Sequence, residues 1–161
     1  MDTKAAIQSQ FLATLEILKK AIEQCPDEMW ADPEPKNKFW HIAFHSLFYT
    51  HFYLHPTQGD FVAWEKQRDE VVSLQPSDDP DKVTPYLQTE VLEYLAFCQQ
   101  QVKEKVASSD LTAESGFHWL PFNTFEKHLY NIRHTQLHVG ELCERLGQAG
   151  IDVDWVGMVR E

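Results

Sequence analysis

The chain has 161 residues, of which 43% are apolar and 12% aromatic, and this is enough for one domain with a substantial core. Its 14 Lys and Arg against 25 Asp and Glu give a net charge of −11, and no basic stripe runs along the chain, so nucleic acid is not an expected partner. No run of about 18 apolar residues occurs, so we expect no membrane span and a cytoplasmic protein. Only six glycines accompany many Leu, Gln, Glu, Lys and Ala residues, which predicts an all-α fold.

The first two predicted helices differ in their apolar patterns. One begins at Asp2 or Thr3, has apolar residues at steps of three and four, and ends near Cys25 before Pro26. The next, residues 39–55, runs for seventeen residues with hardly a charge before Pro56 stops it. Because it is apolar on nearly every side, we expect neighbouring segments to bury it all round.

The middle of the chain is predicted to be a long connection followed by a third helix. Residues 57–83 contain Pro76, Pro80 and an Asp-rich turn, so we expect a loop with one short helix around residues 61–68. Pro85 is suited to be the first residue of the third helix, which extends to about Ala107.

The fourth predicted helix runs from Asn123 to Leu146. Asn123 and Glu126 resemble a capping box, and Gly147 and Gly150 supply stop signals. A helical wheel at about 100° per residue places five apolar residues in the stripe expected to face the core: Phe125, Leu129, Ile132, Val139 and Cys143. The last residues, 151–161, are expected to dock back on the helices.

Four long helices joined by loops of moderate length predict an up-and-down-like four-helix bundle with one longer crossover loop. The whole chain, residues 1–161, is expected to be a single domain. The three cysteines, Cys25, Cys98 and Cys143, are far apart and odd in number, which predicts reduced thiols rather than a disulfide framework or a thiolate metal site.

Histidine is the unusual residue of this sequence. Of the eight, four lie in residues 41–55 and three in residues 128–138. His134 and His138 are four residues apart in the fourth predicted helix, so both imidazoles lie on one face and can chelate one ion. On the helical wheel, His134 and His138 both lie well away from the centre of the apolar stripe.

The second predicted helix offers a third imidazole from either His41 or His45, which are also four residues apart in a segment expected to be buried. A buried histidine needs a polar partner or a metal ion. Three imidazoles from two helices leave coordination positions open, as in catalytic or binding sites for zinc and similar ions. Thr135 and Gln136 follow His134 where the H-E-x-x-H motif has its glutamate, so no peptidase is predicted.

Two segments, FWHIAFHSLFYTHFYL and NIRHTQLHVGEL, resemble the DinB-like superfamily of damage-inducible four-helix bundle proteins. This superfamily includes bacillithiol S-transferases and mycothiol-dependent maleylpyruvate isomerases. The resemblance covers most of the chain and extends to Trp155 and Val156 near its end. It implies that His45, His134 and His138 bind one divalent ion, zinc or nickel first, with iron or manganese as alternatives. The superfamily often has Gln at the position of Glu141, which is therefore either a hydrogen-bond partner of a ligand or a surface residue.

The resemblance also implies a metal-dependent S-transferase that acts on a low-molecular-weight thiol and a small-molecule electrophile. Arg133 is the nearest cationic candidate to hold such a thiol. Metal-assisted hydrolysis is a second hypothesis, with Glu141 as the only carboxylate close in sequence to the ligands. A third is a non-enzymatic stress or scaffold protein in which the ion ties two helices together. A homodimer is expected in each case, because such bundles often pair through helix faces.

The remaining candidates are more simply explained by packing. We interpret His41 as an imidazole bonded to a backbone carbonyl, and His51 and His55 as helix-end or interface residues. Nothing in the sequence pattern around His118 or His128 indicates a functional role. Four aromatic residues are candidates to line the pocket, although core packing is the simpler interpretation for each: Trp40, Tyr49, Trp119 and Phe122.

Overall fold

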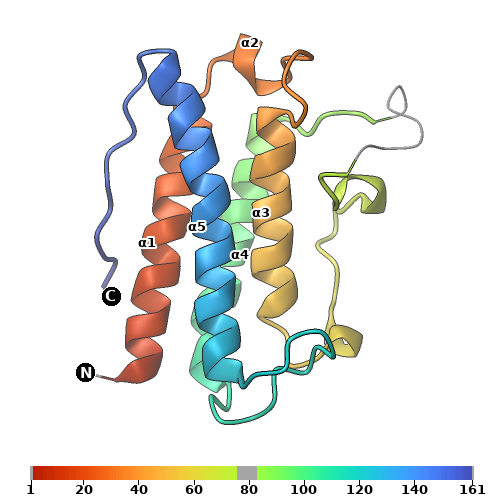
Figure 1. Ribbon diagram of the computed structural model, residues 1–161, viewed down its shortest axis with the longest axis vertical. Helices are drawn as coiled ribbons and strands as arrows, with labels where there is room; N and C mark the ends of the chain where they lie inside the picture. Colours follow the sequence, from red (N-terminus) through yellow and green to blue (C-terminus); the bar gives the residue numbers. More distant parts are fainter. Residues whose placement is uncertain (1, 76–82, 161) are drawn as a thin grey trace.

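The computed structural model describes residues 2–75 and 83–160 (Figure 1). Within these ranges the chain is helical and has no strand, apart from an isolated bridge between Glu114 and Asn123. The predicted all-α class is confirmed. Its α-helices in this part of the chain are α1 (Thr3–Gln24), α2 (Asp27–Trp30), α3 (Phe39–Tyr53), α4 (Gln88–Ser108) and α5 (Thr124–Gln148).

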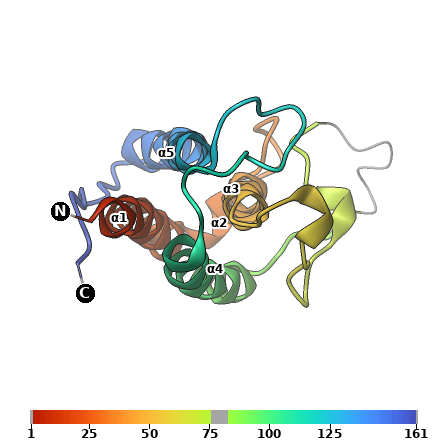
Figure 2. The same cartoon turned by 90° about the horizontal axis from the view of Figure 1, so that it is seen from below.

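Four long helices lie side by side, and Figure 2 shows them end-on. α1 contacts α4 and α5, and α3 contacts the same two helices. Figure 1 shows α1 and α5 running in one direction and α3 and α4 in the other. Because α3 and α4 are parallel, the chain returns between them through the long crossover of residues 54–87, part of which is described.

α3 is the most deeply buried helix, as its composition predicts. Twelve of its fifteen residues are buried, since α4, α5 and the crossover cover it on different sides. Aromatic residues of the crossover complete this cover. Phe61 packs at a tilt against His51 with ring centroids 5.1 Å apart, and the Trp64 ring stacks on Tyr94 of α4 at 4.5 Å.

The predicted ends of α1 and α5 agree closely with the structure. The Asp2 side chain accepts a hydrogen bond from the Lys4 backbone N–H, and Cys25 ends α1 before Pro26. The Asn123 side chain accepts from the Glu126 N–H in the same way at the start of α5. These caps are local in sequence, which is why pattern alone locates them.

The predicted start of the third helix is wrong. α4 begins at Gln88 rather than Pro85, and the Glu90 carboxylate accepts the Leu87 backbone N–H just before it. Tyr86 is not helical because its ring enters the core, where it stacks on Phe44 at 4.5 Å and donates its hydroxyl hydrogen to the Lys66 carbonyl. A distant partner therefore sets this boundary.

The short helix predicted around residues 61–68 is also wrong. That stretch is not helical, and one-turn 3₁₀ helices flank it, η1 (Gln58–Asp60) and η2 (Asp69–Val71). An open backbone lets the Phe61 and Trp64 rings reach separate parts of α3 and α4, and an isolated helix of two turns is only marginally stable in water. Pro76 and Pro80, which helped to predict the loop, lie outside the described residues. The four-residue α2 was not expected.

The wheel is right for part of the buried face of α5 and wrong for its first half. Val139 is buried, and Ile132 and Cys143 pack against the core. Phe125 and Leu129 are instead 38% and 47% exposed, and the buried face in this half of α5 carries mainly polar residues. These polar residues find partners across the core. The buried Lys127 ammonium donates to the carbonyls of His55 and Ser115.

The chain after α5 docks back, as expected. Val153, Val156 and Val159 pack against the core, and Gln10 of α1 donates a hydrogen bond to the Gly157 carbonyl. Figure 1 shows this segment running back along α1. Among the described residues, no helix is both long and apolar enough to cross a membrane.

Candidate metal centre

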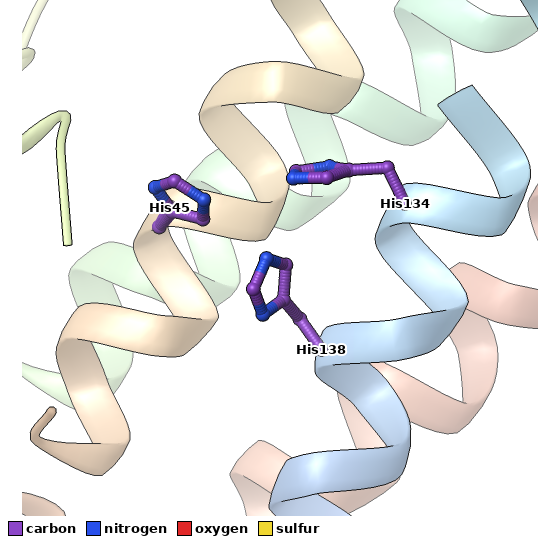
Figure 3. Close-up of side chains that lie close together, drawn as sticks. All are labelled: His45, His134 and His138. Atoms are coloured by element: carbon purple, nitrogen blue, oxygen red, sulfur yellow. The ribbon is translucent and has the colours of Figure 1, made fainter. Parts of the chain in front are cut away.

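His45 of α3 and His134 and His138 of α5 lie together between the two helices, with their rings directed towards a common point (Figure 3). Each residue has one ring nitrogen within 4.8 Å of the corresponding nitrogens of the other two. The His138 ring centroid is 4.8 Å from each of the other two, and the His45 and His134 centroids are 5.5 Å apart. The structure thus brings together the three residues that the resemblance implies.

Polar contacts between α3 and α5 fix the alignment that this arrangement requires. The hydroxyl oxygens of Thr50 and Thr135 are 2.7 Å apart, and the Asn131 side chain donates to the Thr50 carbonyl at 3.0 Å. All three residues are fully buried. A slip of one helical turn, about 5.4 Å, would break both contacts and separate the histidines.

Two of the three imidazoles have their orientation set by a hydrogen bond. Nδ1 of His45 lies 2.8 Å from the Val72 carbonyl oxygen, and Nδ1 of His138 lies 2.7 Å from a carboxylate oxygen of Glu141. Both acceptors require an N–H on Nδ1, which leaves the Nε2 lone pair free. Histidines that bind metal ions are commonly oriented in this way by a carbonyl or a carboxylate.

His134 supplies the observation that tests whether an ion fits. Its Nδ1 is buried and has no hydrogen-bond partner among the described residues. Its ring lies between Tyr49, whose centroid is 5.4 Å away, and Tyr130, which stacks on it at 6.5 Å. A polar nitrogen in such surroundings needs a partner. An ion beside it, or a water bound to that ion, can meet this need.

Burial keeps His45 and His134 in the neutral form that binds metal ions. The pKa of His45 is lowered to about 4, mainly by burial, with the Val72 hydrogen bond opposing this and the charges of His138 and His134 contributing to it. The pKa of His134 is also lowered to about 4, mainly by burial and then by His138. Both rings are therefore neutral at pH 7, so no proton has to leave before an ion binds.

The spacing fits an ion after a small inward movement of the rings. A tetrahedral ion with bonds of about 2.0–2.1 Å separates its nitrogen ligands by about 3.4 Å, somewhat less than the 4.8 Å limit within which the three atoms lie. Changes in the histidine side-chain torsions can close this gap. Three protein ligands leave at least one position for an exogenous ligand, which is the pattern of catalytic sites.

Tyrosine residues border the centre on one side. The Tyr49 ring contacts both His45 and His134, at centroid distances of 4.8 and 5.4 Å. Tyr53 packs edge-on against Tyr130 at 5.5 Å, and its hydroxyl accepts a hydrogen bond from Nε1 of Trp119. Burial and the neighbouring Tyr130 raise the pKa of Tyr49, so its hydroxyl stays neutral and able to donate.

Glu141 and Arg133 take different positions relative to the three histidines. Glu141 is a hydrogen-bond partner of a candidate ligand, which decides between the two roles left open by the sequence. Arg133 is exposed, and its guanidinium lies 5.6 Å from the centroid of the Tyr130 ring. It is therefore at the outer edge of the tyrosine side of the centre.

The other histidines do not join the centre. His41 lies 2.9 Å from the Val71 carbonyl through Nε2, which confirms its interpretation as a carbonyl-bonded imidazole. His51 and His55 do lie at the end of α3, but they are buried, with His51 bonded to the Tyr94 hydroxyl at 3.1 Å. His128 is buried near the start of α5, and His118 is exposed.

The pocket-lining candidates divide between the centre and the core. Tyr49 borders the centre, whereas Trp40 is buried near the start of α3 and contacts His41 and Tyr86. Trp119 donates a hydrogen bond to the Tyr53 hydroxyl and Phe122 packs against Tyr130, so both contact the tyrosines rather than the candidate ligands. Sequence reasoning missed Tyr130, although its position four residues before His134 could have indicated it. It could not have found the Val72 carbonyl, because a backbone acceptor leaves no side-chain signal.

Comparison with known proteins adds no assignment. No family model, curated protein or solved structure gives a significant match to the chain. The candidate site therefore rests on its geometry, and the DinB-like resemblance rests on the two histidine-bearing segments.

Proposed function

We propose that the chain is a DinB-like four-helix bundle that binds one divalent ion through His45, His134 and His138 and acts as a thiol S-transferase. The observation that carries this proposal is the convergence of three imidazoles, two of them already held by hydrogen bonds through Nδ1. Zinc or nickel is the first choice of ion, with iron or manganese as alternatives; imidazole ligands suit zinc, nickel and iron, whereas manganese favours oxygen ligands.

An ion in this position supplies Lewis acidity, which lowers the pKa of a coordinated thiol. The protein side chains have separate tasks. Val72 and Glu141 hold the His45 and His138 rings in the required tautomer, and Tyr49 and Tyr130 limit access of water on one side. In the overall reaction sulfur forms a bond to an electrophilic carbon, the leaving group departs with its electron pair, and the thiol proton passes to solvent.

Metal-assisted hydrolysis is less well supported. It needs a general base beside the attacking water, and Glu141 is the carboxylate that the sequence offered for this task. In the structure that carboxylate accepts a hydrogen bond from His138. Glu141 is thus better placed to orient a ligand than to remove a proton from water.

The homodimer stays a prediction. Phe125, Leu129 and Leu137 expose apolar surface on α5, which is compatible with pairing through this helix face. Sedimentation equilibrium of the purified chain, with Leu137→Lys as the variant, tests it. A monomeric mass across the concentration range would contradict the expected dimer.

The test of the ion begins with the metal content of untagged protein, compared with a His134→Ala, His138→Ala double variant. We expect about one ion per chain in the parent protein and none in the double variant. His118→Ala is the matched control, because it removes an exposed imidazole away from the centre. Absence of bound zinc, nickel, iron or manganese at neutral pH, even after exposure to each, would contradict the proposal.

The test of the reaction uses the metal-loaded protein with cysteine as the thiol and 1-chloro-2,4-dinitrobenzene as the electrophile. We expect the rate of thioether formation to depend on the ion and to fall to the uncatalysed rate in the double variant. If the ion binds but a panel of thiols gives no turnover, while its removal strongly lowers the melting temperature, the protein is a metal-stabilised scaffold instead.

A further inference from the structure

Two histidines of α3 hold the crossover through neighbouring backbone carbonyls. The Val71 carbonyl oxygen accepts a hydrogen bond from Nε2 of His41 at 2.9 Å, and the Val72 carbonyl oxygen accepts one from Nδ1 of His45 at 2.8 Å. The two histidines are one helical turn apart, and their acceptors are consecutive residues. Figure 1 shows α3 between α5 and the described part of the crossover, so both contacts lie on the side of α3 that faces away from α5.

His41 is oriented for this contact and cannot bind the ion through the same nitrogen. Its ring stacks on Trp40 with centroids 4.9 Å apart and an interplanar angle of 17°. Trp40 is only 2% exposed, so the ring of His41 rests on a side chain that packing holds in place. A carbonyl oxygen can only accept, so Nε2 of His41 carries the hydrogen and has no lone pair to offer.

The Val71 contact matters because the next carbonyl orients a candidate ligand. Consecutive peptide groups are planar and share one Cα atom, so a fixed Val71 carbonyl restricts where the Val72 carbonyl can lie. The segment has little regular structure of its own to hold it. η2 is a single 3₁₀ turn of three residues, and such a turn is only marginally stable alone. Its contacts with α3 therefore decide its position.

The ring of His45 joins the crossover to the metal centre. One side of the ring donates to Val72, and the ring also lies beside His138 and His134, at centroid distances of 4.8 and 5.5 Å. Coordination of an ion at Nε2 makes the Nδ1–H group a stronger donor. Binding at the two nitrogens is linked, so any factor by which the Val72 contact raises ion affinity is also the factor by which the ion stabilises that contact.

We propose that His41 is a positioning residue for the ion, because it holds Val71 so that the Val72 carbonyl orients His45. Binding of the ion in turn fixes η2 and Val72 against α3, so the crossover responds to whether the centre is loaded. This inference rests on the metal site of the proposed function but not on the S-transfer reaction. It gives His41 a role beyond packing.

The first test measures hydrogen exchange by NMR in zinc-loaded and metal-free protein. The backbone N–H groups of Val71 and Val72 donate hydrogen bonds inside and at the end of η2, each at 3.3 Å. Partners of metal-binding histidines typically change metal affinity about 10- to 100-fold, so zinc should slow the exchange of these two amides about tenfold or more. The amides of Asp60 and Phe61 form the equivalent bonds of η1 and should not respond.

The second test uses variants of His41. His41→Phe keeps a ring that can stack on Trp40 but has no N–H, and it should weaken zinc binding about two- to tenfold, the value of one hydrogen bond. It should also reduce the effect of zinc on the η2 amides. His41→Gln retains a donor and should restore most of both. Lys66→Gln is the matched control, because it removes a different contact of the crossover, the ion pair with Glu93 of α4.

A purely structural role of His41 predicts a different pattern. His41→Phe would then lower the melting temperature but leave the zinc affinity of the folded protein equal to that of the parent, which would overturn the proposal. It is also overturned if the parent binds zinc while Val71 and Val72 exchange as fast as in the metal-free protein. This measurement needs no variant, so it decides the matter even if His41→Phe does not fold. Absence of zinc binding in the parent would overturn the proposed function as well, which distinguishes the two failures.

Discussion

Replacing Glu141 with alanine tests the link between the hydrogen bonds and the affinity for an ion. The carboxylate lies 2.7 Å from Nδ1 of His138, a charge-assisted contact that fixes the ring and makes Nε2 more basic. Loss of such a partner typically weakens metal binding about 10- to 100-fold. The Glu141 side chain is 47% exposed, so solvent screens it and we expect the lower end. A tenfold loss corresponds to about 1.4 kcal/mol.

The assay is a competition titration of zinc between the protein and a chromophoric chelator. Glu141→Gln keeps a hydrogen-bond acceptor without the charge and should fall between the parent protein and Glu141→Ala. Glu144→Ala is the matched control, because it removes an equal charge from an exposed position on the same helix. Equal zinc affinities for Glu141→Ala and Glu144→Ala would refute the reasoning.

Two further predictions concern stability. Burial lowers the pKa of His51 to about 3 and that of His128 to about 4, so below about pH 6.5 only the unfolded chain takes up these protons. Between pH 7 and pH 5.5 each histidine should therefore remove about 1 kcal/mol from the free energy of unfolding of the metal-free protein, measured by urea denaturation. If His128→Phe loses as much stability between these two pH values as the parent protein does, the reasoning is contradicted. Gly116 has φ of +78°, and a Cβ there would lie 1.8 Å from the Pro56 carbonyl oxygen. Gly116→Ala should therefore cost well over the roughly 1–2 kcal/mol of a left-handed alanine, whereas Gly150→Ala, with φ of +79° and open space, should cost only that amount in the same assay.

The parts of the fold that sequence predicted correctly depend on nearby residues. Asp2 and Asn123 cap the helices that they precede, and Pro26 and Pro56 follow the first two long helices closely. Near-continuous apolarity was sufficient to predict that α3 is buried. Each of these signals acts within a few residues, so it survives whatever the rest of the chain does.

The errors arose where a partner is distant in sequence. A wheel ranks faces by apolarity, so it could not show that Lys127 is buried through the carbonyls of His55 and Ser115. The same limit hid Asn131, which donates to the Thr50 carbonyl across the core. Phe125 and Leu129 accordingly lie on the outer side of α5.

The candidate site depends partly on a local sequence signal and partly on contacts between residues distant in sequence. The spacing of His134 and His138 predicted their common face from α5 alone, while the choice of His45 over His41 came from the resemblance. In the structure both rings bond to carbonyls of the crossover, but His41 does so through Nε2 and His45 through Nδ1. Only His45 also lies beside the histidines of α5, and this depends on tertiary packing.

The two groups that hold the candidate ligands differ in how easily mutation can remove them. Glu141 acts through its side chain, so one nucleotide change can delete the contact with His138. Val72 acts through its carbonyl oxygen, which every amino acid carries, so substitutions at this position leave the acceptor in place. Sequence drift can therefore adjust the His138 side of the centre in single steps, whereas the His45 side changes only when the path of the crossover changes.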